Sequence, residues 1–123
     1  MGGSLAFIYT SSYEGQGLPP IEAMTTGAPV LAFDNSAVRE MVPPEMLVAD
    51  PEVDDDEGFC KFPGKRLPQT TLDEVIDRLR ELLIRNSWEL ASKAAVAHAG
   101  RFTAEAFDAP ILAVYKNISG ELR

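Results

Sequence analysis

The sequence predicts an α/β fold built on a short parallel sheet, and three observations support it. Two short apolar, β-prone runs, Leu5–Thr10 and Pro29–Phe33, are typical of strands buried on both faces of a sheet. Between them, Pro19 and Pro20 suit the first turn of a helix, and Gly27 suits its end. This order of strand, helix and strand predicts a βαβ unit with parallel strands.

The segments that follow extend this unit. We expect a short helix at Ala37–Val42 and a third strand at Met46–Ala49, which gives a sheet of about three strands. Residues 50–69 are rich in acidic residues, proline and glycine, and they predict an irregular acidic loop. The length of 123 residues suits one compact core, so residues 1–123 are interpreted as a single domain.

The C-terminal part, residues 70–118, predicts a helical tail. A hydroxyl of Thr70 or Thr71, followed by acidic residues, is a helix start signal. Apolar residues then recur at spacings of three and four, which predicts an amphipathic helix that packs on the rest of the chain. Two further helices are expected at about 87–99 and 103–118, separated by Gly100.

Composition excludes several classes of function. The formal net charge of −8 argues against a broad basic surface for nucleic acid or anionic lipid. A single cysteine, Cys60, excludes an internal disulfide and suits a reducing compartment. Apolar runs are too short for a membrane span, and the N-terminus lacks the pattern of a signal peptide. A cytoplasmic protein is therefore predicted.

The informative segment runs from Ser11 to Met24. It places Glu14 and Glu22, with seven residues between them, after the first strand and in the opening turn of the next helix. Ligands of open α/β sheets bind at this rim. Gly15 and Gly17 leave the backbone unobstructed, so that peptide N–H groups and the positive end of the helix can approach a phosphate.

Acidic residues beside an anion site suit a ligand that also offers hydroxyl groups. Sugar and ribose hydroxyls donate hydrogen bonds, and a carboxylate can accept two of them. The segment therefore predicts a site for a nucleotide sugar.

The run S-x-Y-E-G-x-G-L-P-x-x-E-A-M, followed by T-G-A-P-V, resembles the E-x7-E motif of family 4 of the retaining GT-B glycosyltransferases. The segments D-N-S-A-V-R-E-M-V, L-V-A-D-P and R-F-T-A-E-A-F are also similar to that family. The resemblance covers about Leu5 to Tyr115 and implies the C-terminal part of a Rossmann-like, donor-binding domain.

The resemblance also implies roles for individual residues. Glu14 is similar to the catalytic acid that contacts the donor hexose and supports charge at the anomeric carbon. Glu22 is similar to the acid that accepts hydrogen bonds from the ribose. The backbone N–H groups of Gln16, Gly17 and Leu18 are expected to face the sugar and the β-phosphate. The implied reaction transfers a hexose from a nucleoside diphosphate sugar to an acceptor hydroxyl with retention, without an obligatory metal or other cofactor.

Departures from the family define the expected partners. Gln16 and Thr10 replace residues that are more usual in the family, and residues 52–69 exceed the usual connection. The phosphate-binding Arg and Lys and the acceptor domain of the family lie upstream of the segments matched here. We hypothesise a truncated or split enzyme, weak or inert alone, whose partner is a missing N-terminal domain or upstream chain. Self-association through the open edge of Leu5–Thr10 is the other expectation.

Two other functions stay open at this point. One is a non-catalytic Rossmann-like module that binds a nucleotide or a protein. The other is an epimerase or phosphorylase that shares the GT-B architecture.

Single residues outside the motif suggest little chemistry. Glu40 could approach a ribose, but a solvated helical acid is the preferred interpretation. The run Asp54–Glu57 fails the EF-hand pattern because Pro63 occupies the position of the final glutamate. His98 is not expected to be a general base, and Cys60 has no partner for metal or nucleophile chemistry.

Overall fold

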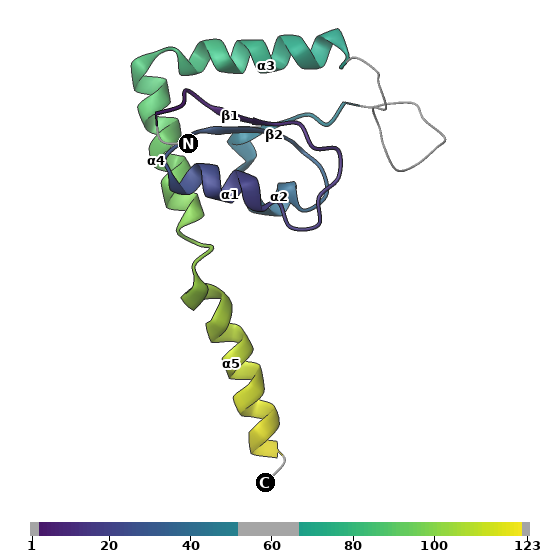
Figure 1. Ribbon diagram of the computed structural model, residues 1–123, viewed down its shortest axis with the longest axis vertical. Helices are drawn as coiled ribbons and strands as arrows, with labels where there is room; N and C mark the ends of the chain where they lie inside the picture. Colours follow the sequence, from purple (N-terminus) through teal and green to yellow (C-terminus); the bar gives the residue numbers. More distant parts are fainter. Residues whose placement is uncertain (1–2, 52–66, 122–123) are drawn as a thin grey trace, which may run out of the picture.

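The computed structural model describes residues 3–51 and 67–121, and the side chains of residues 107 and 118–121 are excepted. Residues 52–66 of the expected acidic loop therefore lie outside the described residues. This range includes Cys60 and the run Asp54–Glu57. The described elements, in chain order, are β1 (Phe7–Tyr9), α1 (Leu18–Thr25), β2 (Val30–Phe33), α2 (Val38–Met41), the 3-10 turn η1 (Pro44–Met46), β3 (Leu47–Val48), α3 (Gln69–Leu82), α4 (Arg85–Ala99) and α5 (Ala104–Glu121) (Figure 1).

The three strands form one sheet in the order β1-β2-β3, and both pairings are parallel. Phe7 lies opposite Val30, and Ala32 lies opposite Leu47. All four residues of the central strand β2 are buried, as expected of a strand covered on both faces. The predicted α/β class with a short parallel sheet is confirmed.

Helices cover the two faces of the sheet. α1 and α2 lie on one side in Figure 1 and α3 lies on the other. Alternate residues of β2 point to the two sides, so the sheet has two cores. The first core contains Val30, Ala32 and buried residues of α1, α2 and α4. The second contains Leu31, Phe33 and Val48, against which Leu67 and the apolar side of α3 pack.

The start of α1 follows the sequence expectation. Gly17 caps the helix in the left-handed region (φ 65°), and Pro19 and Pro20 lie in the first turn. Proline suits these positions because the first N–H groups of a helix have no partner within it. The first turn consequently exposes fewer backbone donors than an ordinary helix start.

The end of α1 is a Schellman motif. Gly27 (φ 80°) donates its N–H to the carbonyl of Met24 at 3.0 Å, and Ala28 donates to the carbonyl of Ala23 at 3.2 Å. These two bonds satisfy carbonyls that the helix leaves unpaired, and they turn the chain into β2. The predicted end of the helix at Gly27 is therefore confirmed.

The expectation that the first strand is buried on both faces is wrong. β1 spans only Phe7–Tyr9, and the side chain of Ile8 is 45% exposed. Ile8 lies opposite Leu31 and shares its face of the sheet. α3 contacts β3 on that face and its side chains cover β2, so the edge strand β1 keeps one face open.

The predicted cap of α3 is also wrong. The helix begins at Gln69 after Pro68, and no side-chain hydrogen bond caps it. The carbonyl of Pro68 instead accepts the N–H of Thr71 at 3.1 Å, and Thr71 is itself buried. The extended backbone of Pro68 starts the helix before either threonine can cap it.

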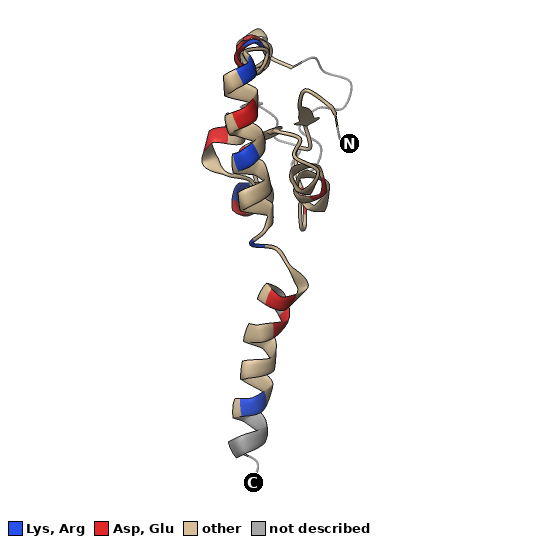
Figure 2. Cartoon of the chain, turned by 90° about the vertical axis from the view of Figure 1, so that its left-hand side faces the viewer, with Lys and Arg blue, Asp and Glu red and all other residues tan. Residues whose placement is uncertain are grey.

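α5 differs from the other helices because it packs on little else. Every α5 side chain that the structure describes is exposed, and the helix extends away from the sheet in Figure 1. Its middle carries no charged residue in Figure 2, and exposed apolar side chains gather there: Ile111, Leu112, Val114 and Tyr115. An isolated helix of this length is marginal in water, and Pro110 weakens it further.

The end of α1 generates a stability prediction. Gly27→Ala should lower the free energy of unfolding by about 1–2 kcal/mol, because an L-residue is strained at positive φ. The new Cβ would also lie 3.1 Å from Oγ of Ser92 on α4. Urea unfolding followed by circular dichroism measures this loss. The control is Gly15→Ala, where an added Cβ meets nothing within 4 Å. Equal stability of the two variants would contradict the prediction.

Candidate functional site

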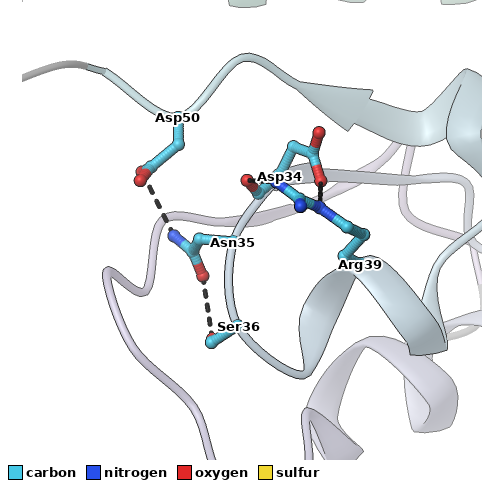
Figure 3. Close-up of polar contacts among 5 residues, drawn as sticks. All are labelled: Asp34, Asn35, Ser36, Arg39 and Asp50. Carbon is cyan, nitrogen blue, oxygen red and sulfur yellow. Dashed lines mark hydrogen bonds and ion pairs between the residues drawn. The ribbon is translucent and has the colours of Figure 1, made fainter.

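The candidate site lies where the three parallel strands end. The loop Ser11–Gly17 follows β1, the turn Asp34–Ser36 follows β2, and Asp50 follows β3. The carboxyl ends of parallel strands meet at one edge, which is the usual ligand edge of an open α/β sheet. Side chains from the second and third of these segments contact one another in Figure 3.

Asn35 connects all three strand ends. Its Nδ2 donates to the carbonyl of Ser11 at 3.0 Å and to Oδ1 of Asp50 at 3.1 Å. Its Oδ1 accepts a hydrogen bond from Oγ of Ser36 at 3.1 Å (Figure 3). The residue is only 7% exposed, so these bonds replace the water that a buried amide loses.

Ser36 also forms a hydrogen bond with the loop after β1. Its Oγ accepts the N–H of Glu14 at 3.0 Å. Ser36 has φ 39°, a left-handed conformation that is uncommon for a residue with a Cβ. Strained backbone of this kind persists where surrounding contacts fix it.

The Glu14 side chain is held within its own loop. Ser11 Oγ donates to Oε1 of Glu14 at 2.7 Å, and the Tyr9 hydroxyl also donates to the carboxylate. These bonds, from Tyr9 first and then Ser11, lower the pKa of Glu14 below its ordinary value of 4.5. Burial, and then Glu14, raises the pKa of Tyr9 to about 12. At neutral pH the site therefore holds an ionised carboxylate and a neutral phenol.

The backbone amides of the predicted donor loop, residues 11–18, are open to a ligand. Within the described residues, the N–H groups of Gln16, Gly17 and Leu18 make no hydrogen bond, whereas Pro19 and Pro20 have no N–H to offer. These are the three amides that the sequence analysis named, and their contact with a sugar or a phosphate stays a prediction.

Glu22 lies further along α1 than the sequence suggested. It is the fifth residue of the helix, beyond the opening turn, and its side chain is exposed. Its side chain forms no hydrogen bond with Glu14 or its partners in the described part of the chain. Whether the two carboxylates share one ligand stays a prediction.

A hollow of about 530 Å³ adjoins the loop. Gln16 and Leu18 line one side, and Arg101, Phe102 and Thr103 of the α4–α5 connection line another. No local sequence pattern places this connection beside the loop Ser11–Gly17, because about 85 residues separate Gln16 from Arg101 along the chain.

The residues set aside on sequence grounds show little sign of chemistry. Glu40 is exposed on α2, and Arg39 beside it pairs with Asp34 at 2.6 Å (Figure 3). His98 is half-buried beside Phe102, and its Nε2 has no hydrogen-bond partner in the described structure. In residues 3–51 and 67–121, no group of three His, Cys, Asp or Glu side chains could hold a metal.

Sequence reasoning missed Tyr9, Asn35 and Ser36. A signal existed for the last two, since asparagine and serine directly after a buried strand are typical of turns that bond their own backbone. Their partners in the loop after β1 lie more than twenty residues away, and no local pattern indicates them. Tyr9 was interpreted only as part of an apolar strand.

The hydrogen bonds to Glu14 generate a prediction on pH. The stabilisation by ionised Glu14 is complete above its unfolded pKa near 4.5 and is lost as pH falls through the lower folded pKa. Tyr9→Phe removes the first of these bonds, so the pKa of Glu14 should rise toward 4.5. Titration of the Glu14 carboxyl by NMR measures both values. Tyr115→Phe, at an exposed position of α5, should leave the titration unchanged. An unchanged titration in Tyr9→Phe would contradict the assignment.

Two comparisons with known proteins match parts of this chain to glycosyltransferases. Residues 1–58 match the family model described as glycosyl transferases group 1, and this range contains β1 to β3 and the loop Ser11–Gly17. The chain is also 31% identical over 111 residues to an O-antigen chain mannosyltransferase B of Escherichia coli. That alignment covers 89% of this chain but 24% of the relative, so the chain spans about a quarter of the relative's length.

No solved structure matches the chain significantly. Among the described helices, none has both the length and the apolar character needed to cross a membrane. The likeness to glycosyltransferases therefore rests on the family match over residues 1–58 and on the mannosyltransferase.

Proposed function

We propose that this chain is the donor-binding part of a glycosyltransferase and binds a nucleoside diphosphate sugar at the loop Ser11–Leu18. The observation that carries the proposal is the arrangement of this loop, in which unpaired amides adjoin an ionised carboxylate at the ligand edge of a parallel sheet. The match of residues 1–58 to group 1 glycosyltransferases supports it. The likeness to a mannosyltransferase favours a hexose, with mannose as the first candidate.

The loop amides are the anion-binding part of the proposed site. A diphosphate needs hydrogen-bond donors, and the N–H groups of Gln16, Gly17 and Leu18 have no other partner in the described structure. Gly15 and Gln16 are exposed, so a ligand can reach this backbone. Oriented peptide N–H groups bind phosphate well because their partial charges act together.

Glu14 is the proposed catalytic residue. Its carboxylate accepts bonds from Ser11 and Tyr9 and keeps capacity for a sugar hydroxyl, because a carboxylate has about four acceptor sites. Its negative charge would stabilise the positive charge that develops at the anomeric carbon when the bond to the diphosphate breaks. The hexose then joins an acceptor hydroxyl with retained configuration, and no metal ion is required by this scheme.

Glu22 is the proposed ribose ligand. Its exposed carboxylate, one turn into α1, is free to accept the two neighbouring hydroxyls of a ribose. A carboxylate at this place also discriminates in favour of a ligand with hydroxyl donors over a free phosphate.

The proposal extends to the chain's surroundings. We propose that the open side of β1 and the apolar side of α5 pack against further polypeptide that supplies the acceptor site and the basic phosphate ligands. On this view residues 1–123 form one domain that is weak or inert alone. The cytoplasmic location expected from the single cysteine belongs to the same proposal.

A second candidate is a non-catalytic interaction module. The exposed Ile8 on the edge strand and the exposed apolar residues of α5 favour it, because such surfaces mark protein contacts. This candidate requires no nucleotide, which gives a clear test between the two.

Titration calorimetry with UDP, GDP and their mannosyl and glucosyl esters tests the donor site. One nucleotide series should bind, and Glu22→Gln should weaken it by about tenfold or more, because a charge-assisted hydrogen bond contributes roughly 1.5–3 kcal/mol. The control is Glu40→Gln, which makes the same replacement of a carboxylate by an amide at an exposed residue of α2. Indifference of the protein to every nucleotide would favour the interaction module.

A steady-state assay tests whether the chain is inert alone. The purified chain, given the nucleotide sugar that binds best and simple mannosides or glucosides as acceptors, should release no nucleoside diphosphate above the background hydrolysis. Retained nucleotide binding in the same preparation shows that the protein is folded. Robust transfer by the chain by itself would refute this part of the proposal.

A further inference from the structure

We propose that Asn35 and Ser36 are positioning residues that hold the donor loop in its binding conformation. Neither residue bears a group expected to touch the nucleotide sugar, and both act through Glu14 and Ser11. The consequence for ligand binding rests on the proposed function. The role in holding the loop does not rest on the proposed function, because it follows from the contacts of the two side chains.

Asn35 has no spare hydrogen-bonding capacity on its amide nitrogen. Both Nδ2 protons are used, one on the carbonyl of Ser11 and one on Asp50. Since Ser11 and Asp50 follow different strands, the amide fixes the distance between the two outer loops of the sheet. A buried amide with every donor satisfied specifies one arrangement, because any other arrangement leaves a donor unpaired.

Ser36 connects Asn35 to the donor loop by two hydrogen bonds of its hydroxyl. The Asn35 carbonyl receives the Ser36 proton, which orients the Oγ lone pairs toward the N–H of Glu14. The left-handed backbone of Ser36 (φ 39°) brings its side chain to this position. A serine in a strained conformation, bonded on both sides of its hydroxyl, is unexplained by the fold alone.

The Glu14 amide is the point at which the donor loop is fixed. The next three residues form no hydrogen bond of their own to the rest of the described chain before α1 begins. The bond from Glu14 to Ser36 therefore determines where the unpaired amides start, and the Glu14 carboxylate is carried on the same residue. Loss of this bond should loosen the amides and the carboxylate together.

Ser36→Gly is the decisive variant, because it removes the hydroxyl while glycine adopts positive φ without strain. The matched control is Ser92→Ala, which removes a half-buried hydroxyl of α4, outside the donor loop, for which the described structure shows no hydrogen bond. Three quantities are measured on each purified chain: hydrogen exchange of the Glu14 amide by NMR, the titration of the Glu14 carboxyl, and the binding of nucleotide sugars by calorimetry.

In Ser36→Gly, the Glu14 amide should exchange about fivefold faster, the factor that corresponds to one ordinary hydrogen bond. The pKa of Glu14 should rise toward 4.5, because Tyr9 and Ser11 no longer meet a fixed carboxylate. The midpoint of urea unfolding should not fall, which separates the effect from general destabilisation. Ser92→Ala should behave as the wild type in every measurement.

The outcomes distinguish this inference from the proposed function. Unchanged exchange and titration in Ser36→Gly would overturn the positioning role. If both change and no nucleotide binds to either protein, the positioning role stands and the donor function fails. If both change and the nucleotide sugar binds equally well to wild type and variant, the loop does not need positioning and the inference is overturned. A parallel fall in affinity supports both.

Discussion

The side-chain amide of Asn35 is the interaction on which the ligand edge of this protein depends. A parallel sheet aligns its strand ends but leaves the loops beyond them without ladder hydrogen bonds. Here the first loop contains two glycines and the third strand is two residues long, so neither is rigid by itself. One buried asparagine bonds Ser11 on one side and Asp50 on the other, and thereby joins loops that the sheet alone does not join.

This arrangement explains how a flexible segment can present an ordered set of donors. Glycine permits close approach of a ligand, but it also costs the most conformational entropy to fix. The loop meets this cost through contacts at its start, namely the bonds of Glu14 to Ser36, Ser11 and Tyr9, and through Gly17 at the cap of α1. The amides of Gln16, Gly17 and Leu18 can then remain unpaired. The bonds of Glu14 therefore hold the ionised carboxylate and the start of the unpaired amides together.

Local patterns predicted much of the fold, but not the contacts that hold the loop Ser11–Leu18, whose role in donor binding stays a prediction. Pro19, Pro20 and Gly27 bound α1 because their backbone preferences act within a few residues. The apolar run around Ile8 predicted a buried strand. Ile8 is exposed because α3 covers β2 and β3 but not β1, and no local pattern indicates which strands a distant helix covers. The Thr70 and Thr71 signal failed since Pro68 began the helix first. The partners of Asn35 are set by strand order, so they appear only once the three strands are side by side.

The uncovered surfaces follow from the same architecture. β2 is buried because it has a neighbour on each side and a helix on each face, whereas β1 has one neighbour and one covered face. α5 extends beyond both cores and exposes Ile111, Leu112 and Val114 around a proline, a combination that intrinsic helix propensity alone supports poorly. An apolar face of this size gains free energy only when it is removed from water. Packing of α5 and β1 against further polypeptide would therefore stabilise the elements that flank the donor loop, and it would enclose the site from the side that the sheet leaves open.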